Sequence, residues 1–507
     1  MLRLGSVLTA AAVSTIALLP CAAQNGADTA KGGGERIVID AQAAGTPFPH
    51  FWEQMFGSGR ANLALRDAYR TDLTRVKQIT DFRYVRFHAI LDDENGVYSE
   101  DEKGNAIYNW SYVDQIYDGL LAHGVRPFIE ISFMPKQMAS RPESMGFWDR
   151  PIIAPPADYA KWDALMTAFA QHLVERYGVD EVAQWYFEVW NEPNIGFWGG
   201  NPAQKTYFEL YDHTARALKS VSPRLRVGGP ATAQAAWVGD MIAHATENQV
   251  PLDFVSSHAY GDDTAKDVFH DNRSIQPHQM VCLAVDKVHK EILHSRRPDI
   301  PLIWSEFNAS FANYRSLTDS VYMGPWLAET ISKCDGKTLM MSYWTFSDVF
   351  DEQGVVKTPF YGGFGLVADD GIPKPAFDAF MLLHELGDER LATSRDDALV
   401  TRKADGTLVI AAWNLVEPGA SGADKTVAFE LKGVDEHTLA TVRRVDASHG
   451  DTLDAWLKMG SPPYPTPAQV GELRKAAEIG SPETITVQDH CLTLTLPPMG
   501  LAVVEIH

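Results

Sequence analysis

Between residues 48 and 387, short apolar runs alternate with segments in helical spacing, and this alternation restricts the fold more than any other feature. Runs of five to seven residues with β-branched and aromatic side chains are typical of buried strands. They are Tyr84–His88, Pro127–Ser132, Trp185–Trp190, Leu225–Gly229, Phe254–His258, Leu302–Glu306 and Leu339–Thr345. Repeated strand–helix units produce parallel strands, so their number predicts an α/β fold, a (β/α)8 TIM barrel. No glycine-rich dinucleotide loop follows the first run, which disfavours a Rossmann sheet.

Two of the segments between the runs show the helical spacing clearly. From Val113 to Leu121, apolar residues recur at intervals of three and four, and Gly124 supplies a stop. The same spacing extends from Tyr159 to Tyr177, directly before Gly178. Both segments are therefore predicted to be helices that bury one face against the strands.

After residue 388 the helical spacing is replaced by short alternating strands, so residues 388–507 are predicted to form an all-β sandwich. The segment 35–47, with the apolar run Ile37–Ala41, is expected to add a strand to it. The other expected strands are Ala398–Lys403, Thr407–Trp413, Thr426–Leu431, Ala440–Asp446, Thr484–Val487, Leu492–Leu496 and Leu501–Ile506. The Pro-rich stretch Met459–Gly480 is expected to be an insertion with a helix from Gln469 to Ala477.

The first 23 residues have the tripartite form of a secretory signal peptide. Arg3 precedes an apolar stretch from Val7 to Leu19, and small residues suited to cleavage after Ala22 or Ala23 follow. The apolar stretch is too short to span a bilayer comfortably, and Pro20 before Cys21 fits a lipid-attachment site poorly. The prediction is a periplasmic or secreted protein without a membrane span, with a flexible lead-in over residues 24–34.

The net charge excludes two classes of binding partner. The formal net charge is −22, without a cluster of lysines and arginines, which argues against nucleic acid and anionic membranes as partners.

The three cysteines beyond the signal peptide, Cys282, Cys334 and Cys491, form no disulfide framework, so we expect buried free thiols and leave a Cys282–Cys334 bridge open. No His-Glu-x-x-His or Cys-x-x-Cys pair occurs, so no metal or other cofactor is expected. The oligomeric state is not predicted.

The decapeptide Trp185–Asn194 (Trp-Tyr-Phe-Glu-Val-Trp-Asn-Glu-Pro-Asn) carries the strongest functional signal. Pro193 ends the strand and is expected to hold Glu192 in an extended conformation. Beside Trp190 and Trp198 a carboxylate is poorly solvated, which raises its pKa and suits it to general-acid catalysis. The alternative is a surface glutamate in a turn, but the aromatic and amide neighbours favour catalysis.

A second glutamate ends a strand in the same way. Glu306 closes the run Pro-Leu-Ile-Trp-Ser-Glu, and catalytic groups of a TIM barrel lie at the C-terminal ends of its strands. Enzymes that hydrolyse glycosides use two carboxyl groups on opposite sides of a cleft, of which one is protonated and the other ionised. Strand-end glutamates can instead be structural partners of a barrel arginine such as Arg86.

Several stretches together resemble glycoside hydrolase family 39, whose best-known members are β-xylosidases. The resemblance covers nearly the whole chain beyond the signal peptide. It rests on Gly57–Arg60, Arg86–His88, Glu130–Pro135, Glu188–Asn194, Ser257–Tyr260, Ser305–Asn308, Tyr343–Asp348 and Met459–Pro465. It implies that Glu192 is the acid/base and Glu306 the nucleophile of a retaining enzyme, and that Asn191 binds the sugar 2-hydroxyl.

The resemblance also implies a set of substrate-binding residues. These are His88, Asn191, His258, Tyr260, Trp344, Asp351 and Glu352. His88 and Tyr260 could equally be satisfied core groups. Glu130 is interpreted as a buried brace, and Gly57–Arg60 as serving either the barrel floor or the nucleophile.

The predicted function is a retaining exo-glycosidase that hydrolyses β-1,4-xylosides from the non-reducing end. Three alternatives remain open: another sugar within the family (an arabinoside, exopolysaccharide or iduronide), endo action, or carbohydrate binding without catalysis. An iduronide would need cations near its carboxylate. No Lys or Arg follows Glu306 before Arg315, and Asp351 and Glu352 would repel a uronate, so xylose is favoured.

Overall fold

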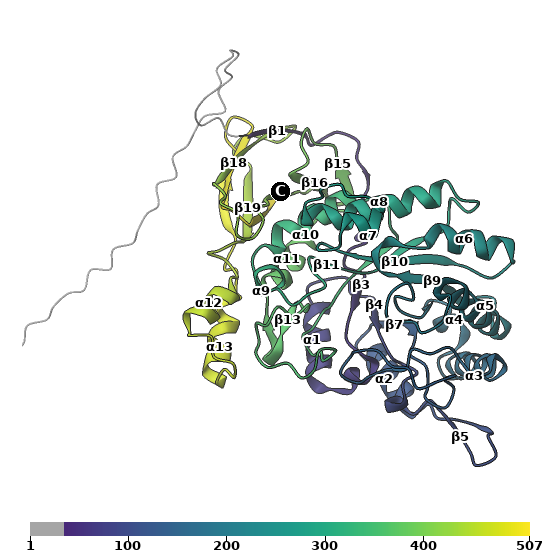
Figure 1. Ribbon diagram of the computed structural model, residues 1–507. Helices are drawn as coiled ribbons and strands as arrows, with labels where there is room; N and C mark the ends of the chain where they lie inside the picture. Colours follow the sequence, from purple (N-terminus) through teal and green to yellow (C-terminus); the bar gives the residue numbers. More distant parts are fainter. Residues whose placement is uncertain (1–34) are drawn as a thin grey trace, which may run out of the picture.

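The computed structural model describes residues 35–507 (Figure 1). The predicted signal peptide and the lead-in, residues 1–34, lie outside the described residues. Over residues 35–507 no helix is both long and apolar enough to cross a bilayer.

Eight parallel strands close into a barrel, which confirms the predicted TIM-barrel class. In the order in which they pair around the barrel, they are β3 (Met55–Gly57), β4 (Tyr84–Phe87), β7 (Arg126–Ile131), β8 (Tyr186–Val189), β9 (Arg226–Thr232), β10 (Phe254–Tyr260), β11 (Leu302–Asn308) and β12 (Met340–Tyr343). Seven of them correspond to the predicted runs. The prediction missed β3, because three residues are too few to show a strand pattern.

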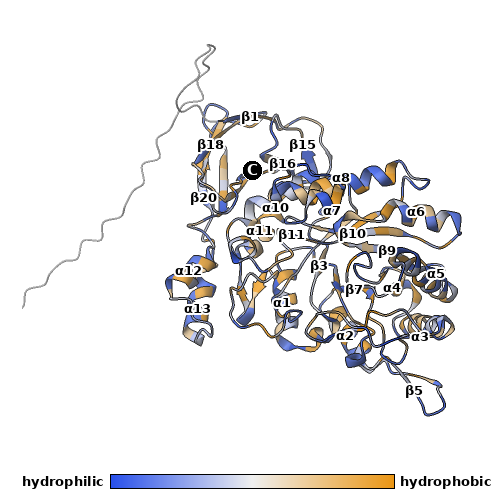
Figure 2. Cartoon of the chain, in the orientation of Figure 1, coloured by the Kyte–Doolittle hydropathy of each residue, from blue (hydrophilic) through white to orange (hydrophobic). Residues whose placement is uncertain are grey.

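Amphipathic helices surround the barrel, and Figure 2 shows both hydrophobic and hydrophilic faces on helices such as α5 and α6. The helices of the barrel domain are α1 (Asp67–Lys77), α2 (Ser111–Ala122), α3 (Tyr159–Tyr177), α4 (Val179–Val182), α5 (Ala203–Val221), α6 (Val238–Glu247), α7 (Ala265–Phe269), α8 (Pro277–Leu293), α9 (Arg315–Thr318), α10 (Met323–Cys334) and α11 (Pro375–Leu383). The helices predicted at Val113–Leu121 and Tyr159–Tyr177 are α2 and α3. Gly178 caps α3 with a φ of 81°, a conformation that favours glycine.

The C-terminal strands form two sheets around an apolar core of their own. One sheet joins β1 (Glu35–Asp40), β18 (Lys425–Lys432) and β21 (Cys491–Leu496). The other holds β2 (Thr46–Pro47), β15 (Glu389–Leu391), β16 (Ala398–Arg402), β17 (Leu408–Asn414), β22 (Gly500–Ile506), β19 (Leu439–Val445) and β20 (Glu483–Thr486). Strand β17 is buried on both faces. Ile410 packs inside the sandwich, whereas Val409 and Trp413 join the core that includes helices α10 and α11.

Between β19 and β20 the chain leaves the sandwich and returns to the barrel. This insertion contains α12 (Thr452–Lys458), which was not predicted, and α13 (Pro467–Ala476), which matches the predicted helix and begins with a capping box at Thr466. Trp456 and Leu473 pack against Phe360 in the long connection after β12. Two small hairpins complete the fold, β5–β6 (Tyr98–Glu100, Ala106–Tyr108) and β13–β14 (Val367–Ala368, Ile372–Pro373).

The cysteines only partly match the expectation of buried free thiols. Cys282 on α8 and Cys334 at the end of α10 are free and buried, with their sulfur atoms 2.6 Å apart. Cys491, in contrast, is disulfide-bonded.

Candidate active site

A cavity of about 250 Å³ lies at the C-terminal ends of the barrel strands. Both predicted catalytic glutamates and five of the seven predicted substrate-binding residues line it. Its lining residues are His88, Phe147, Asn191, Glu192, Ile195, Phe197, Ala233, Gln234, Tyr260, Asp263, Glu306, Phe311, Trp344, Glu352, Gln353 and Phe364.

Arg86 on β4 is the hub of the polar groups beneath this cavity. Its side chain is fully buried, and its Nε donates to Glu188 Oε2 (2.6 Å) and its Nη1 to Glu306 Oε1 (2.6 Å). Its Nη2 lies 2.8 Å from Glu130 Oε2 and donates to Asn191 Oδ1 (2.9 Å). Burial alone would lower the pKa of Arg86, but the charges of Glu188, Glu130 and Glu306 outweigh it and raise that pKa. The guanidinium therefore stays charged and fixes the positions of three carboxylates.

Glu306 lies on β11 at an irregular stretch of strand. The pairing of β11 with β10 and β12 shifts register here, so Glu306 reaches the cavity while Trp304 and Phe307 both pack in the outer core. Its Oε1 accepts a hydrogen bond from Arg86 and its Oε2 one from Tyr260 Oη (2.6 Å). Burial and the charge of Glu306 raise the pKa of Tyr260, so this phenol remains a neutral donor. These two donors hold both carboxylate oxygens in fixed positions, as a nucleophile requires.

Glu192 follows β8 and has the opposite environment. Burial first, and then the charge of Glu306, raise its pKa well above the ordinary value, the direction expected for a general acid. The expected extended backbone at Glu192 is wrong, because its φ is 43°, in the left-handed region. Its backbone N–H donates to Ala231 O (2.8 Å) on the neighbouring β9, and this contact helps to hold the turn.

His258 on β10 connects the two glutamates from behind the cavity wall. Its Nδ1 lies 3.0 Å from Glu192 Oε1 and 3.7 Å from Glu306 Oε1, and its Nε2 is 3.1 Å from Ser305 Oγ. Burial and the nearby positive charges of Arg86 and His88 lower its pKa, so the ring is neutral. His258 is fully buried and contacts both carboxylates, so in this structure it can position the two glutamates.

His88 and Glu352 form the second polar wall of the cavity. His88 Nδ1 contacts Glu130 Oε2 at 2.6 Å, which matches the interpretation of Glu130 as a brace. His88 Nε2 lies 3.4 Å from Glu352 Oε1, which forms no regular hydrogen bond within the described residues. The pKa of Glu352 is raised by burial, while His88 opposes this rise. A buried oxygen of this kind suits a sugar hydroxyl, which supplies the missing donor.

Trp344 forms an apolar surface of the cavity and depends on Gly57. A Cβ atom on Gly57 would lie 2.2 Å from the Trp344 ring, so any larger residue would displace the indole. Gly57 therefore serves the cavity, and Arg60 three residues later binds Asp351. This role in shaping the cavity is neither of the two that were left open for Gly57–Arg60.

Asp351 does not line the cavity, contrary to prediction. Arg60 Nη1 donates to its Oδ1 and Arg66 Nη2 to its Oδ2 (3.3 Å), so both oxygens are occupied. The sequence places Asp351 beside Glu352, but the two side chains have different partners. Asn191 does face the cavity. Because its Oδ1 accepts from Arg86, its amide N–H groups remain for a ligand.

The sequence interpretation missed Asp263 and Gln234, which lie on the side of Glu192. Burial raises the pKa of Asp263 to about 7, and its Oδ2 accepts from Tyr260 N (2.8 Å). The Gly-Asp-Asp sequence after Tyr260 was a usable signal for Asp263. Gln234, in a turn with a φ of 61°, had no such signal.

The arrangement can transfer a proton and supply a nucleophile without further groups. The same site could hold a metal ion, because one ligand atom from each of Glu192, His258 and Glu306 lies within 4.8 Å of the other two. Such an ion would occupy the acid and nucleophile positions, so it would compete with a sugar.

The known proteins that this chain is similar to include glycoside hydrolases. Residues 35–487 match the family described as glycosyl hydrolases family 39. A β-xylosidase from Geobacillus stearothermophilus is 38% identical over 85% of this chain and 86% of its own length. One from Caldicellulosiruptor saccharolyticus is 36% identical over 85% and 88%. The solved structure of a GH39 β-xylosidase from Caulobacter crescentus has a TM-score of 0.81 at 35% identity, covering 93% of this chain and 100% of that one.

Proposed function

The chain belongs to glycosyl hydrolase family 39 and is a glycoside hydrolase, and on this premise we propose that it is a retaining exo-β-xylosidase. Glu306 acts as the nucleophile and Glu192 as the acid/base. Protonated Glu192 gives its proton to the glycosidic oxygen while Glu306 attacks the anomeric carbon. Ionised Glu192 then takes a proton from the water that releases the sugar.

The carboxylate separation carries the proposal of retention. A carboxylate oxygen of Glu192 and one of Glu306 lie within 4.8 Å of each other. Retaining enzymes keep their carboxyl groups about 5–5.5 Å apart, whereas inverting enzymes need about 6.5–9.5 Å to admit a water molecule. The spacing therefore supports direct attack by Glu306.

The closure of the cavity supports exo action. Phe147 comes from the connection after β7, and Glu352 and Gln353 come from the connection after β12. Trp148 N donates to Glu352 O (2.9 Å), so the two connections are joined beside the cavity. A joined wall and a volume of about 250 Å³ suit the end of a chain better than its middle.

Charge favours a neutral sugar over a uronate. Among the described residues, no lysine or arginine lines the cavity, whereas Asp263 and Glu352 do. A substrate carboxylate would meet these groups without a cation to pair with. The β-xylosidase relatives support xylose as the neutral sugar.

Three measurements on the purified protein test the proposal. In a screen of aryl xyloside, arabinoside, glucoside and iduronide, the β-xyloside should have the highest kcat/KM. Proton NMR of xylobiose hydrolysis should show β-xylose before mutarotation, and an α-product would overturn retention. Xylotetraose should yield xylose and xylotriose first, whereas early xylobiose would indicate endo action.

We also propose that the protein is exported to the periplasm or secreted, because residues 1–23 have the form of a signal peptide. N-terminal sequencing of the protein recovered from its host should begin at Ala23 or Gln24. A product that retains Met1 would contradict export through this segment.

A further inference from the structure

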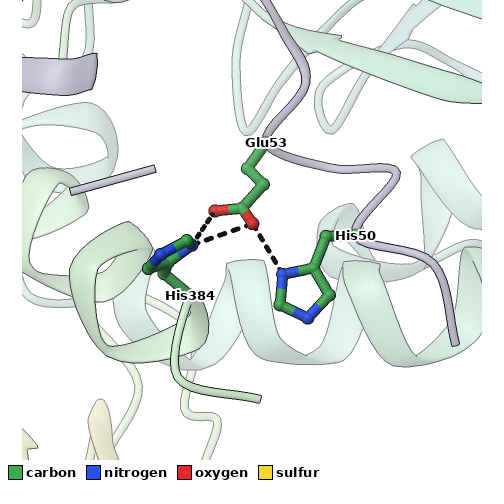
Figure 3. Close-up of side chains that lie close together, drawn as sticks. All are labelled: His50, Glu53 and His384. Carbon is green, nitrogen blue, oxygen red and sulfur yellow. Dashed lines mark hydrogen bonds and ion pairs between the residues drawn. The ribbon is translucent and has the colours of Figure 1, made fainter. Parts of the chain in front are cut away.

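A second group of metal-type ligands lies at the opposite end of the barrel from the active site. His50 and Glu53 belong to the connection between β2 and β3, and His384 directly follows α11 (Figure 3). Glu53 precedes the first barrel strand, so the group sits at the N-terminal ends of the strands. One atom from each side chain lies within 4.8 Å of the other two.

The two histidines converge on a single buried carboxylate. His50 Nδ1 lies 2.6 Å from Glu53 Oε1, and His384 Nδ1 lies 2.9 Å from Oε1 and 2.8 Å from Oε2. Glu53 is fully buried, and its side-chain hydrogen bonds are to these two rings. A buried carboxylate needs positive charge beside it, which either protons on the rings or a metal ion can supply.

The His50 ring is held in the orientation of a ligand. Its Nε2 contacts the backbone oxygen of Leu386 at 3.0 Å, and a carbonyl oxygen only accepts, so Nε2 carries the hydrogen. Nδ1 is then the ring atom that faces Glu53 and the one that would ligate an ion. Trp52 stacks on the same ring with centroids 4.5 Å apart. Metal-binding histidines characteristically donate their other N–H to such a carbonyl.

The surroundings allow an ion to reach the group. A cavity of about 490 Å³ includes all three side chains, and Asp81 and Asp388 add carboxylates to its wall. His384 is 43% exposed, so it can move.

We propose that His50, Glu53 and His384 bind one Zn²⁺ ion, with a water molecule as the fourth ligand. Two imidazole nitrogens and one carboxylate oxygen match zinc, whereas calcium prefers six to eight oxygens. Neighbouring ligands of tetrahedral zinc stand about 3.4 Å apart, given bonds of about 2.1 Å. The ligands here are closer, so both His50 and His384 move away from the Glu53 carboxylate, by about half an ångström to one ångström, when the ion binds. The ion ties the segment before the first barrel strand to the end of the last barrel helix.

Zinc titration of metal-free protein tests the site. The variant Glu306→Gln is the background, because the active-site group of Glu192, His258 and Glu306 could bind a second ion. Calorimetry should show one equivalent of zinc. Adding His384→Ala should weaken binding about 100-fold or more and remove the zinc-dependent rise in Tm. Co²⁺ should give the intense visible bands of a tetrahedral site, and the same substitution should abolish them.

Matched controls separate this site from adventitious binding. His244 on α6 is a partly exposed histidine paired with Asp212, and His244→Ala should bind zinc as the background does. His50→Ala should lose zinc binding as His384→Ala does. If His50→Ala fails to fold, the exposed His384 still gives a decisive result. Binding unchanged in His384→Ala, or no stoichiometric binding in the background, overturns the proposal.

Discussion

The two ends of the barrel interior are built from the same strands but from opposite kinds of side chain. At the N-terminal end, a layer of large apolar residues fills the barrel. It consists of Met55, Phe128, Tyr186, Phe254, Ile303 and Met340. Two or three residues further along these strands lie Glu130, Glu188 and Glu306, joined by Arg86. Strand β11 alone contributes Ile303 to one end and Glu306 to the other.

The two ends are expected to contribute differently to the stability of the fold. Apolar burial contributes in proportion to area and tolerates exchange between residues of similar volume. Buried charges lose their hydration, and their mutual attraction offsets that cost only when every partner is present. The apolar end should therefore influence stability alone, whereas the charged end should influence activity first and stability only through Arg86.

The largest expected effect is at the charged end, in Glu306→Gln. The amide cannot attack the anomeric carbon, so kcat/KM on an aryl β-xyloside should fall by about 10⁴-fold or more. The barrel should remain folded, because Gln keeps the volume of Glu. Steady-state kinetics with circular dichroism measures both quantities. Activity above one-tenth of the original would mean that another residue is the nucleophile.

Glu192→Ala should have the next largest effect, and one that depends on the leaving group. Loss of the general acid should reduce kcat/KM by about 10²–10⁴-fold on xylobiose, but much less on an aryl xyloside with an acidic phenol. Azide should restore turnover by attacking the glycosyl-enzyme in place of activated water. Equal losses on both substrates, without a response to azide, would contradict the acid/base role.

Arg86→Met should reduce activity and stability together, unlike the other substitutions at the charged end. Three carboxylates would lose their shared cation, which should cost about 3–5 kcal/mol of unfolding free energy. Burial already raises the pKa of Glu188, and without Arg86 the charge that opposes this rise is lost, so the folded variant binds more protons than the unfolded chain. The deficit should therefore grow as pH rises from 5 to 7. Urea unfolding at several pH values measures it, and a deficit independent of pH would contradict this account.

The sequence predicted most of this arrangement but not the contacts that hold it. Local patterns identify seven barrel strands and both glutamates, because strand composition and strand ends are local properties. The register shift that turns Glu306 inward depends on β10 and β12, and alternation along β11 does not reveal it. Asp351 was assigned to the substrate because its partners, Arg60 and Arg66, lie almost 300 residues earlier in the chain.

Ile303→Val at the apolar end should reduce stability without changing activity. Removing one methylene group from this layer should cost about 0.5–1.5 kcal/mol of unfolding free energy. The value of kcat/KM should stay unchanged, although Ile303 lies on the same strand as Glu306. Urea unfolding and kinetics at 25 °C give the two numbers. A fall in kcat/KM of more than about threefold would show that the two ends are coupled along β11.

The smallest expected effect is a shift of the pH profile in Asp263→Asn. The charge of Asp263 contributes to the raised pKa of Glu192, after burial and Glu306. Without this charge the pKa of Glu192 falls, so Glu192 loses its proton at a lower pH. The alkaline limb of kcat/KM should therefore move down by less than about one pH unit, while the acid limb stays in place. Asn can still accept the hydrogen bond from Tyr260 N, so the loop should be preserved. An unmoved alkaline limb would mean that burial and Glu306 alone determine the protonation of the acid. The Asp263 charge would then lie beside the site without affecting the protonation of Glu192.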